Sequence, residues 1–167
     1  PDDFGADDVA DAGEQGDAEL EPLEAALRGL DVPLAGVTAG AVESEFQTSR
    51  IRGMCDRLGV DCFAPLWGED PTELAEAMLD AGFEILIVQV AARGLDESWL
   101  GRTLDREALA DLHDLHDEYG VHVLGEGGEF ETFVVDGPHM PRRVELEYET
   151  VWEGTRGHLD VTDARLE

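Results

Sequence analysis

The sequence contains no lysine: its 11 basic residues are all arginine, against 40 aspartates and glutamates. The formal net charge is −29 at pH 7. Such a chain repels nucleic-acid phosphates and anionic membrane surfaces, so we expect neither as a partner. The acids are spread along the whole chain, unlike the single block of a disordered acidic tail. Because salt screens this repulsion, the composition predicts a halophilic, haloarchaeal source.

Long apolar runs and cysteines are also scarce in this sequence. No apolar run approaches the length of a membrane span, and no basic-then-apolar leader begins the chain, so we expect a cytoplasmic protein. Cys55 and Cys62 are spaced neither as a metal knuckle nor as a redox pair, which indicates reduced residues in or near the core. The 43% hydrophobic content over 167 residues predicts one folded domain, or one domain with a small appendage.

Strand and helix patterns alternate over residues 20–95, which predicts right-handed βαβ units of an α/β domain. The expected strands are 32–38, 60–66 and 85–92. The expected helices are 21–30, 43–58 and 71–81. The last strand is almost continuously apolar, so we place it at the centre of a parallel sheet flanked by helices. Residues 1–19 are acidic and lack periodicity, and we expect them to form a linker.

Residues 96–167 predict a smaller α+β lobe with antiparallel hairpins. The expected elements are a helix at 105–119 and strands at 121–124, 130–135, 142–152 and 158–166. The last two strands form a hairpin appendage without evident chemistry. His113 and His116 lie one turn apart on the helix, but no third ligand is in register, so we predict no metal site there.

One stretch, residues 121–138, organises this second lobe. Its tip, Gly125–Gly128, lies between two β-branched runs. Glu126 is part of the tip, and Glu129 and Glu131 follow it directly. Glycine adopts backbone angles closed to other residues and lets a ligand approach the main chain. By themselves these residues fit a solvated turn in an acidic chain as well as they fit a binding site.

Two runs resemble motifs of a known family. Gly-Glu-Gly-Gly-Glu-Phe-Glu-Thr at 125–132, followed by Asp-Gly-Pro at 136–138, is similar to the signature of the diphthine–ammonia ligase family of the PP-loop ATPase superfamily. The run 40–50 resembles that family's block of Gly-Ala, Ser, an acid, an aromatic residue, Gln and Arg. Phe46 stands there where Tyr is usual, and Glu45 where Asp is common. Together with the segment 93–102, the resemblance covers about residues 30–143.

The resemblance implies an enzyme that uses ATP and Mg²⁺ to adenylylate the carboxylate of diphthine, a modified histidine on translation elongation factor two. Ammonia then displaces AMP to give diphthamide. Its candidate catalytic residues, which would hold magnesium or ammonium or accept a proton as ammonia attacks, are Glu126, Glu129 and Glu131. Its candidate nucleotide- or substrate-binding residues are Gly40, Ser44, Gln47, Arg50, Arg102, Gly125, Gly127, Gly128 and Thr132.

One departure from the family is large. Its phosphate-binding PP-loop, Ser-Gly-Gly-Lys-Asp-Ser, does not occur in this sequence, which has no lysine to replace it. We therefore expect the chain to be part of a longer protein and to be inactive alone. Two alternatives stay open: a non-catalytic nucleotide- or protein-binding module, and a hydrolase whose acidic tip holds a divalent metal. A PP-loop encoded upstream of Pro1 favours the ligase, and a start codon close to Pro1 favours the module.

Overall fold

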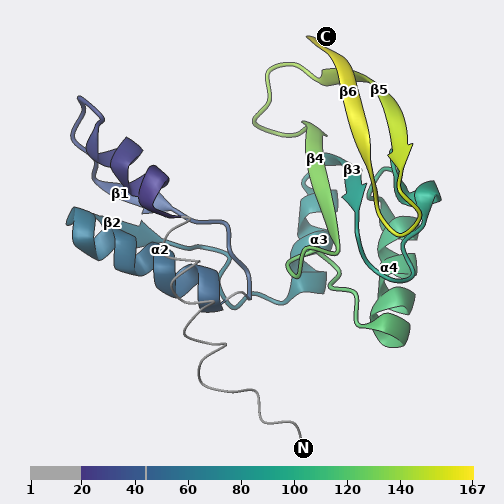
Figure 1. Cartoon of the computed structure of the whole chain (residues 1–167), viewed down its shortest axis with the longest axis horizontal. Coiled ribbons are helices and arrows are strands. Elements are labelled where there is room, and N and C mark those ends of the chain that lie inside the picture. Colours follow the sequence, from purple (N-terminus) through teal and green to yellow (C-terminus); the bar gives the residue numbers. More distant parts are fainter. Residues whose placement is uncertain (1–19, 44) are drawn as a thin grey trace, which may run out of the picture. The chain divides into compact units, whose positions relative to one another are not determined.

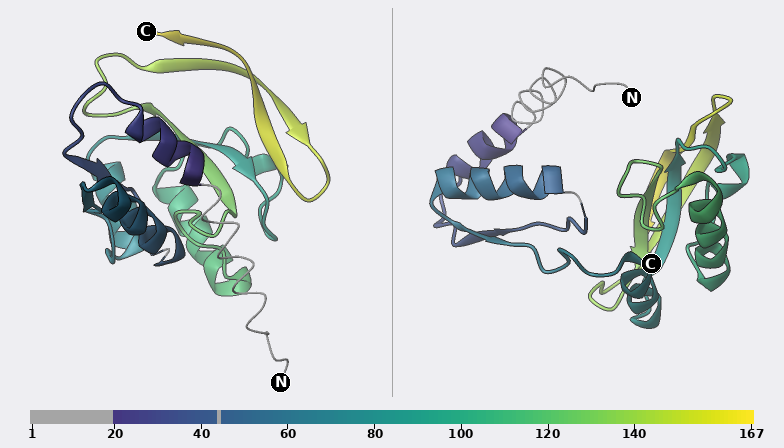
Figure 2. Two further views of the ribbon diagram at one scale, coloured as in Figure 1. Left: turned by 60° about the vertical axis from the view of Figure 1, so that its left-hand side comes forward. Right: turned by 90° about the horizontal axis from the view of Figure 1, so that it is seen from below.

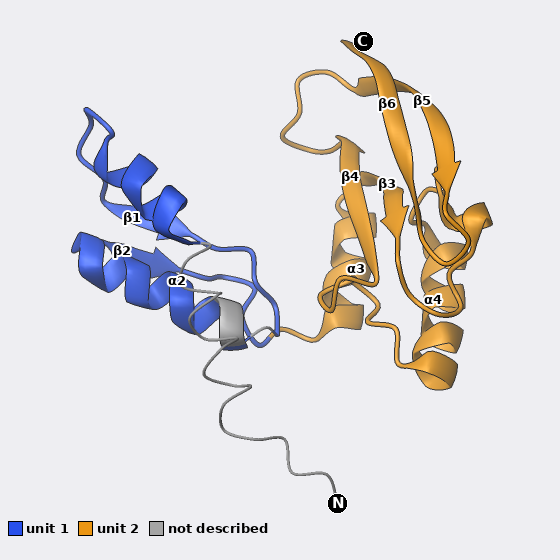
Figure 3. Cartoon of the chain, viewed as in Figure 1, with its two compact units in different colours: residues 1–68 blue, residues 69–167 orange. Residues whose placement is uncertain are grey.

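The computed structural model describes residues 20–43 and 45–167, so the predicted linker at 1–19 lies outside the described residues. The chain divides into two compact units, Pro1–Gly68 and Glu69–Glu167 (Figure 3). The division falls before the third predicted strand, earlier than the expected division after residue 95. No described helix is long and apolar enough to cross a bilayer.

The first unit contains a βαβ connection, as predicted (Figure 1). Its elements are a helical segment at 20–28, β1 (Gly36–Thr38), α2 (Glu45–Leu58) and β2 (Asp61–Phe63). The two strands are parallel, with Val37 opposite Cys62. They are shorter than predicted, because the β-branched and apolar residues that flank them, such as Val32 at 63% exposure, lie outside the pairing.

An apolar face of α2 forms the core of this unit. Met54 is fully buried and Cys55 is 1% exposed, while Ile51 and Leu58 are half-buried beside them. Cys55 and Cys62 are both free thiols, as expected. Burial raises the pKa of the Cys55 thiol, and the neighbouring Cys62 thiol adds to this effect.

Both helices of the second unit begin directly after an aspartate that caps them. α3 (Pro71–Asp80) starts after Asp70, whose carboxylate accepts from the amides of Thr72 and Glu73, each at 2.9 Å. α4 (Arg106–Tyr119) starts after Asp105 and ends at Gly120, which adopts the left-handed conformation with φ 76°. These are the cap chemistries expected of an aspartate before a helix and a glycine after one.

The second unit holds a four-stranded sheet in the order β4-β3-β6-β5. Its strands are β3 (Glu84–Val90), β4 (Phe130–Asp136), β5 (Val144–Trp152) and β6 (Gly157–Leu166), and a 3₁₀ helix, η1 (Glu97–Trp99), follows β3. β3 pairs antiparallel with both of its neighbours. The α/β class is therefore confirmed, but the prediction that this strand is the centre of a parallel sheet is wrong.

The burial of β3 explains the error. Ile85 and Ile87 are buried on one face of the strand, and Leu86 and Val88 are half-buried on the other. An inner strand with apolar side chains on both faces reads as a continuous apolar run whatever the direction of its neighbours. The direction of pairing depends on which distant segments return to it, which a local pattern does not record.

The hairpin of β5 and β6 was predicted correctly, but it is not an appendage. Val90 of β3 pairs with Gly157 of β6, so the hairpin continues the main sheet. Leu159 joins the core that the sheet shares with α3 and α4, whose fully buried members include Ala75 and Leu112. α4 lies alongside the sheet in both views of Figure 2. The end of β3 is thereby placed between β4 on one side and the β5–β6 turn on the other.

Candidate functional site

The tip before β4 consists of two consecutive turns. The amide of Gly125 donates to the carbonyl of His122, and the amide of Gly128 donates to the carbonyl of Gly125, both at 2.9 Å. The strand predicted at 121–124 is therefore wrong. Val121 and Val123, the β-branched residues behind that prediction, are buried, yet they pair with no other strand in the described part of the chain.

At each glycine position of the tip, a different physical reason favours glycine over other residues. Gly125 has a φ of +72°, and a Cβ there would lie 2.5 Å from the carbonyl oxygen of Phe130. Gly128 has a φ of +81°. Gly127 has no positive φ, but a Cβ there would lie 2.6 Å from Oε1 of Glu129. The tip therefore needs glycine twice for backbone conformation and once to admit a carboxylate.

Glu129 is held through its side chain and through its backbone. Oε1 of Glu129 accepts a hydrogen bond from the amide of His122 at 3.1 Å, while its backbone carbonyl accepts from the amide of Ala91 at 2.8 Å. Oε2 is buried and accepts no hydrogen bond from any described residue. A buried carboxylate oxygen without a partner is costly unless a ligand satisfies it. Glu129 therefore offers one acceptor to a hydrogen-bond donor.

His122 organises the same turns through its ring. Nδ1 accepts from the amides of Leu124 at 3.1 Å and Glu126 at 3.4 Å. A nitrogen that accepts two amide protons carries no proton itself, so Nδ1 of His122 acts as an acceptor in these turns. This histidine had no role in the sequence analysis, because one His among acids gives no pattern that identifies it.

The other two glutamates do not converge with Glu129 into a metal site. Glu126 is half-buried in the second turn, and Glu131 is exposed on β4 opposite Gln89. No group of three or more His, Cys, Asp or Glu among the described residues is arranged to hold a metal ion. Thr132 follows on β4, exposed and paired with Ile87.

The candidate residues of the first unit follow β1. Gly40 lies in the loop after the strand, with no atom within 4 Å of where its Cβ would be, so the backbone is open there. Arg50 is half-buried on α2. Ser44 lies outside the described residues, and of Gln47 the structure describes only its place in α2. The carboxyl end of a parallel strand is the position at which α/β proteins bind ligands.

The two arginines that flank η1 differ in their contacts. Arg102, predicted to face a phosphate, donates to Asp111 at 2.6 Å and lies 4.5 Å from the ring centre of Trp99. Its guanidinium is thus already engaged within the fold. Arg93 lies over the ring of Tyr119 at 5.0 Å and forms no ion pair with a described residue.

Arg93 also lines a pocket that the sequence did not indicate. The pocket measures ≈ 420 Å³ and lies between the loop after β3 and the β5–β6 turn; its lining includes Ala91, Arg93, Gly94, Trp152, Thr155 and Arg156. Strand pairing brings these two segments together across more than fifty residues of sequence, as the pairing of Val90 with Gly157 shows. Neither segment contains a sequence pattern that indicates its contact with the other.

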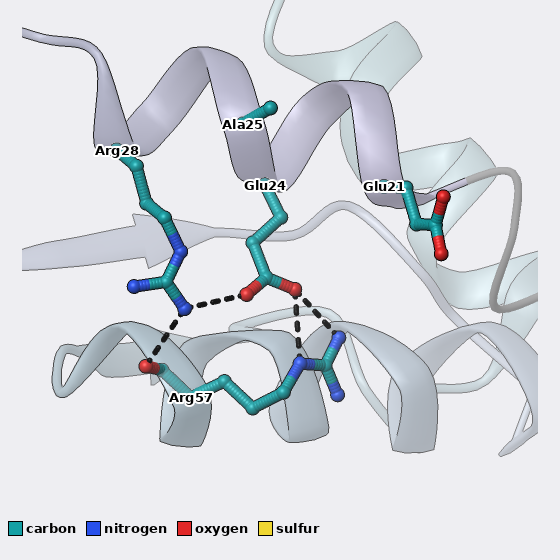
Figure 4. Close-up of a pocket in the computed structure, with 5 residues that line it drawn as sticks. All are labelled: Glu21, Glu24, Ala25, Arg28 and Arg57. Carbon is teal, nitrogen blue, oxygen red and sulfur yellow. Dashed lines mark hydrogen bonds and ion pairs between the residues drawn. The ribbon is translucent and has the colours of Figure 1, made fainter.

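A second pocket, of ≈ 410 Å³, lies in the first unit and is lined by an ion network (Figure 4). Glu24 accepts from Arg28 at 2.7 Å and from Arg57 at 2.9 Å, and these contacts tie the helical segment 20–28 to α2. Two guanidinium groups lower the pKa of Glu24, with Arg57 the larger cause. The network is a tether between two helices, since each charge already has its partner.

Comparison with known proteins matches the second unit to a family. The profile of the family described as Diphthamide synthase C-terminal domain matches residues 70–166, which contain the tip, the sheet and the pocket after β3. The diphthine–ammonia ligase of Danio rerio is 36% identical over 129 residues, covering 75% of this chain and 50% of that protein. The human enzyme is 39% identical over 110 residues, covering 65% of this chain and 41% of that protein.

The diphthine–ammonia ligase of Saccharomyces cerevisiae is 37% identical over 140 residues, which cover 73% of this chain but only 20% of the yeast protein. The chain thus spans half or less of the length of these curated relatives. The profile match covers more than half of this chain, and its limits coincide with those of the second compact unit to within one residue at each end. The chain belongs to the diphthamide synthase C-terminal domain family.

Proposed function

We propose that the chain acts in diphthamide biosynthesis as part of an ATP-dependent diphthine–ammonia ligase in the cytoplasm. The observation that carries this proposal is the family match over residues 70–166, which includes the whole tip. The substrates are the carboxylate of diphthine on translation elongation factor two, ATP and ammonia. Relatives named diphthine–ammonia ligase that share 36–39% of their aligned residues with this chain support the assignment.

The reaction needs two displacements. A carboxylate oxygen of diphthine attacks the α-phosphorus of ATP, diphosphate leaves, and a mixed anhydride with AMP forms. The nitrogen of ammonia attacks the carbonyl carbon of that anhydride, the bond to the AMP oxygen breaks, and the attacking nitrogen loses a proton. The second step therefore needs a group that accepts a proton from nitrogen and holds it away from water.

Glu129 fits this requirement. Its Oε2 is buried and accepts no hydrogen bond from a described residue, and ammonia or the attacking nitrogen is a donor that would satisfy it. The hydrogen bond from the His122 amide to Oε1 fixes the carboxylate while the proton is transferred. We assign Glu129 as the proton acceptor, with Glu126 and Glu131 as flanking charges that favour an ammonium ion near the tip.

The amide of Gly127 is the backbone donor at this site. It donates to no other residue in the described part of the chain, whereas the Gly128 amide is used within the turn. A free amide beside the reacting group stabilises a developing oxyanion. We therefore propose that Gly127 donates to the substrate carbonyl oxygen and that Gly125 and Gly128 shape the turn.

Mg²⁺ accompanies ATP as the counter-ion of its phosphates. The described acids supply no cluster that fits the ion, so no step here passes through the metal. Gly40, Ser44, Gln47 and Arg50 remain our candidates for contacts with the nucleotide in the first unit, and Arg102 and Thr132 remain candidates in the second. Their test is the KM for ATP in single variants.

The deciding experiment measures AMP formation by the whole protein with diphthine-bearing elongation factor two and an ammonium salt. Glu129→Gln should lower kcat by about 100-fold or more, as expected for a lost general base. Glu76→Gln, an exposed glutamate on α3, is the matched control and should leave kcat unchanged. Unchanged kcat in Glu129→Gln contradicts the proton-acceptor role, and absence of AMP formation by the wild-type protein contradicts the ligase function.

A further inference from the structure

His122 holds the tip through both its ring and its backbone. Its ring nitrogen Nδ1 accepts from the amides of Leu124 at 3.1 Å and Glu126 at 3.4 Å. Its backbone carbonyl accepts from the amide of Gly125 at 2.9 Å, and its backbone amide donates to Oε1 of Glu129 at 3.1 Å. One residue therefore contacts both the turns of the tip and the carboxylate that follows them.

These bonds leave one amide of the tip unused. The ring and the carbonyl of His122 accept from the amides at positions 124, 125 and 126, and the amide of Gly128 donates within the second turn. In the run 124–128, only the amide of Gly127 has no partner among the described residues. Because a backbone N–H that the fold does not use is open to a ligand, the bonds of His122 determine which amide the tip presents.

The unused amide lies close to the unused carboxylate oxygen. Oε2 of Glu129 is buried and accepts no hydrogen bond from a described residue. It lies 2.9 Å from the point where a Cβ of Gly127 would be. The tip thus places a donor beside an acceptor. A carbonyl under attack by nitrogen requires such a pair, since its oxygen gains negative charge while the nitrogen loses a proton.

A second histidine ties this segment to α4. Nδ1 of His116, in the last turn of the helix, lies 2.9 Å from the carbonyl oxygen of Val121. A carbonyl oxygen only accepts, so Nδ1 of His116 is the donor. The carbonyl of His116 accepts from the amide of Gly120, the left-handed residue that ends the helix, at 2.8 Å. His122 therefore follows directly on a residue that is bonded to α4 and 2% exposed in the core.

The ring of His122 acts as the side chain of an Asx turn does. Nδ1 of histidine and Oδ1 of asparagine are attached at the same position of the side chain, so either can accept from the amide two residues further on. Glutamine carries its oxygen further from the backbone, and alanine has no acceptor. The contact from Nδ1 to the amide of Leu124 has this two-residue spacing. Asparagine is thus the substitution that preserves the contact.

We propose that His122 is the positioning residue of this site, and that its Nδ1 holds the turns in the form that keeps the Gly127 amide beside Oε2 of Glu129. The inference rests on the proposed function and adds to it the residue on which the donor and the acceptor both depend. His122 acts through the backbone of the tip and is not itself a catalytic residue. Without the Nδ1 acceptor, the amides of Leu124 and Glu126 lose their partner and the turns lose their fixed geometry.

Amide hydrogen exchange, followed by NMR on the 167-residue chain, tests this geometry without catalysis. His122→Ala should speed the exchange of the Leu124 and Glu126 amides about tenfold, because their hydrogen bonds are lost. His122→Asn should keep their protection. The amide of Leu112, in the buried middle of α4, is the internal control and should exchange alike in all variants. Unchanged exchange of Leu124 and Glu126 in His122→Ala overturns the proposal.

AMP formation by the whole protein, with diphthine-bearing elongation factor two and an ammonium salt, tests the effect on the reaction. His122→Ala and His122→Gln should lower kcat about 10- to 100-fold and leave the KM for ATP unchanged, because the reacting groups are misplaced while nucleotide binding is kept. His122→Asn should retain most of the wild-type kcat. His139→Ala, an exposed histidine after β4, is the matched control and should leave kcat unchanged.

Urea midpoints show which variants are folded, and if His122→Ala does not fold, His122→Asn and His122→Gln carry the comparison. Equal losses of kcat in these two variants contradict positioning through the Nδ1 acceptor. Failure of this inference is distinguishable from failure of the ligase function. Wild-type kcat in His122→Gln rejects the positioning role and retains the ligase, whereas ring-dependent protection of the tip amides without AMP formation by the wild-type protein rejects the ligase alone.

Discussion

The carboxylate of Glu129 lies directly over the α-carbon of Gly127, where a Cβ would come within 2.6 Å of Oε1. The position of this acid therefore depends on the absence of a side chain two residues earlier. The same carboxylate is held by the amide of His122 on its other side. The spacing of glycine and glutamate in the tip is thus a packing requirement as well as a chemical one.

Alanine at the three glycines of the tip should affect stability to different degrees. Gly125→Ala combines a positive φ with a clash against the backbone carbonyl of Phe130, and should cost about 2–4 kcal/mol in the free energy of unfolding. Gly128→Ala has open space and should cost about 1–2 kcal/mol for its φ alone. Gly127→Ala should cost less than about 1 kcal/mol, because the clashing carboxylate can swing away.

Urea unfolding at constant salt measures these differences, since urea leaves the ionic strength unchanged. Gly53→Ala, in the interior of α2 with only ordinary contacts, is a control that should be neutral or stabilising. If Gly127→Ala were as destabilising as Gly125→Ala, the Glu129 carboxylate would be fixed too firmly for our account of the tip.

Local chemistry was readable from the sequence wherever neighbours along the chain decide the structure. The caps of α3 and α4 follow from Asp70 and Asp105, and the apolar face of α2 follows from its 3.6-residue period. The strand prediction at 121–124 was wrong because the β-branched residues Val121 and Val123 have the composition of a strand, and only the absence of a partner strand among the described residues distinguishes the two cases.

Non-local features were not readable. The antiparallel surroundings of β3 depend on β4 and β6, which lie far ahead in the chain. The same holds for charge pairing: the sequence made Arg102 a candidate binding residue, and only the fold shows that it pairs with Asp111. Residue types within one segment indicate which chemistry is present, whereas the partner of each charge is set by the tertiary structure.

Glu84 at the start of β3 should titrate below its usual range. It pairs with Arg143, whose Nε donates at 3.0 Å and whose second guanidinium nitrogen also contacts the carboxylate, and this lowers the pKa of Glu84. A carboxyl with a lower pKa in the folded state adds stability above its unfolded pKa. That contribution is lost as the pH falls through the folded value.

Arg143→Gln should bring the pKa of Glu84 back toward its ordinary value, as followed by NMR titration, and should reduce the loss of stability between about pH 5 and pH 3. The effect on the free energy of unfolding should stay below about 1 kcal/mol, because both side chains are more than a third exposed. Arg142→Gln, the adjacent arginine, should leave the titration of Glu84 unchanged. An unshifted Glu84 in Arg143→Gln would show that the pair does not persist in solution.

In the first unit, the pKa of Glu24 should change by different amounts when each of its two arginine partners is removed. Arg57 is the larger cause of the lowered pKa of Glu24, and Arg28 the smaller (Figure 4). Arg57→Gln should therefore raise the pKa of Glu24 more than Arg28→Gln does, in an NMR titration at low salt. Equal shifts would mean that the two guanidinium groups share the carboxylate evenly, and molar KCl should reduce both shifts.

The net charge of −29 should make the stability of the whole chain depend on salt. In dilute buffer the excess acids repel one another, and at about 1 M KCl the Debye length falls to about 3 Å, which removes most of that repulsion. Salt also weakens exposed ion pairs such as that of Arg165 with Glu145, but each contributes only about 0–1 kcal/mol, so relief of repulsion dominates. The Tm should therefore rise from dilute buffer to molar KCl at pH 7.

The control is the same comparison near the isoelectric point, pI ≈ 4.1. There the net charge vanishes and the rise in Tm should vanish with it, which separates charge screening from a general salt effect. Equal Tm values in dilute buffer and molar KCl at pH 7 would show that the acidic surface does not limit stability.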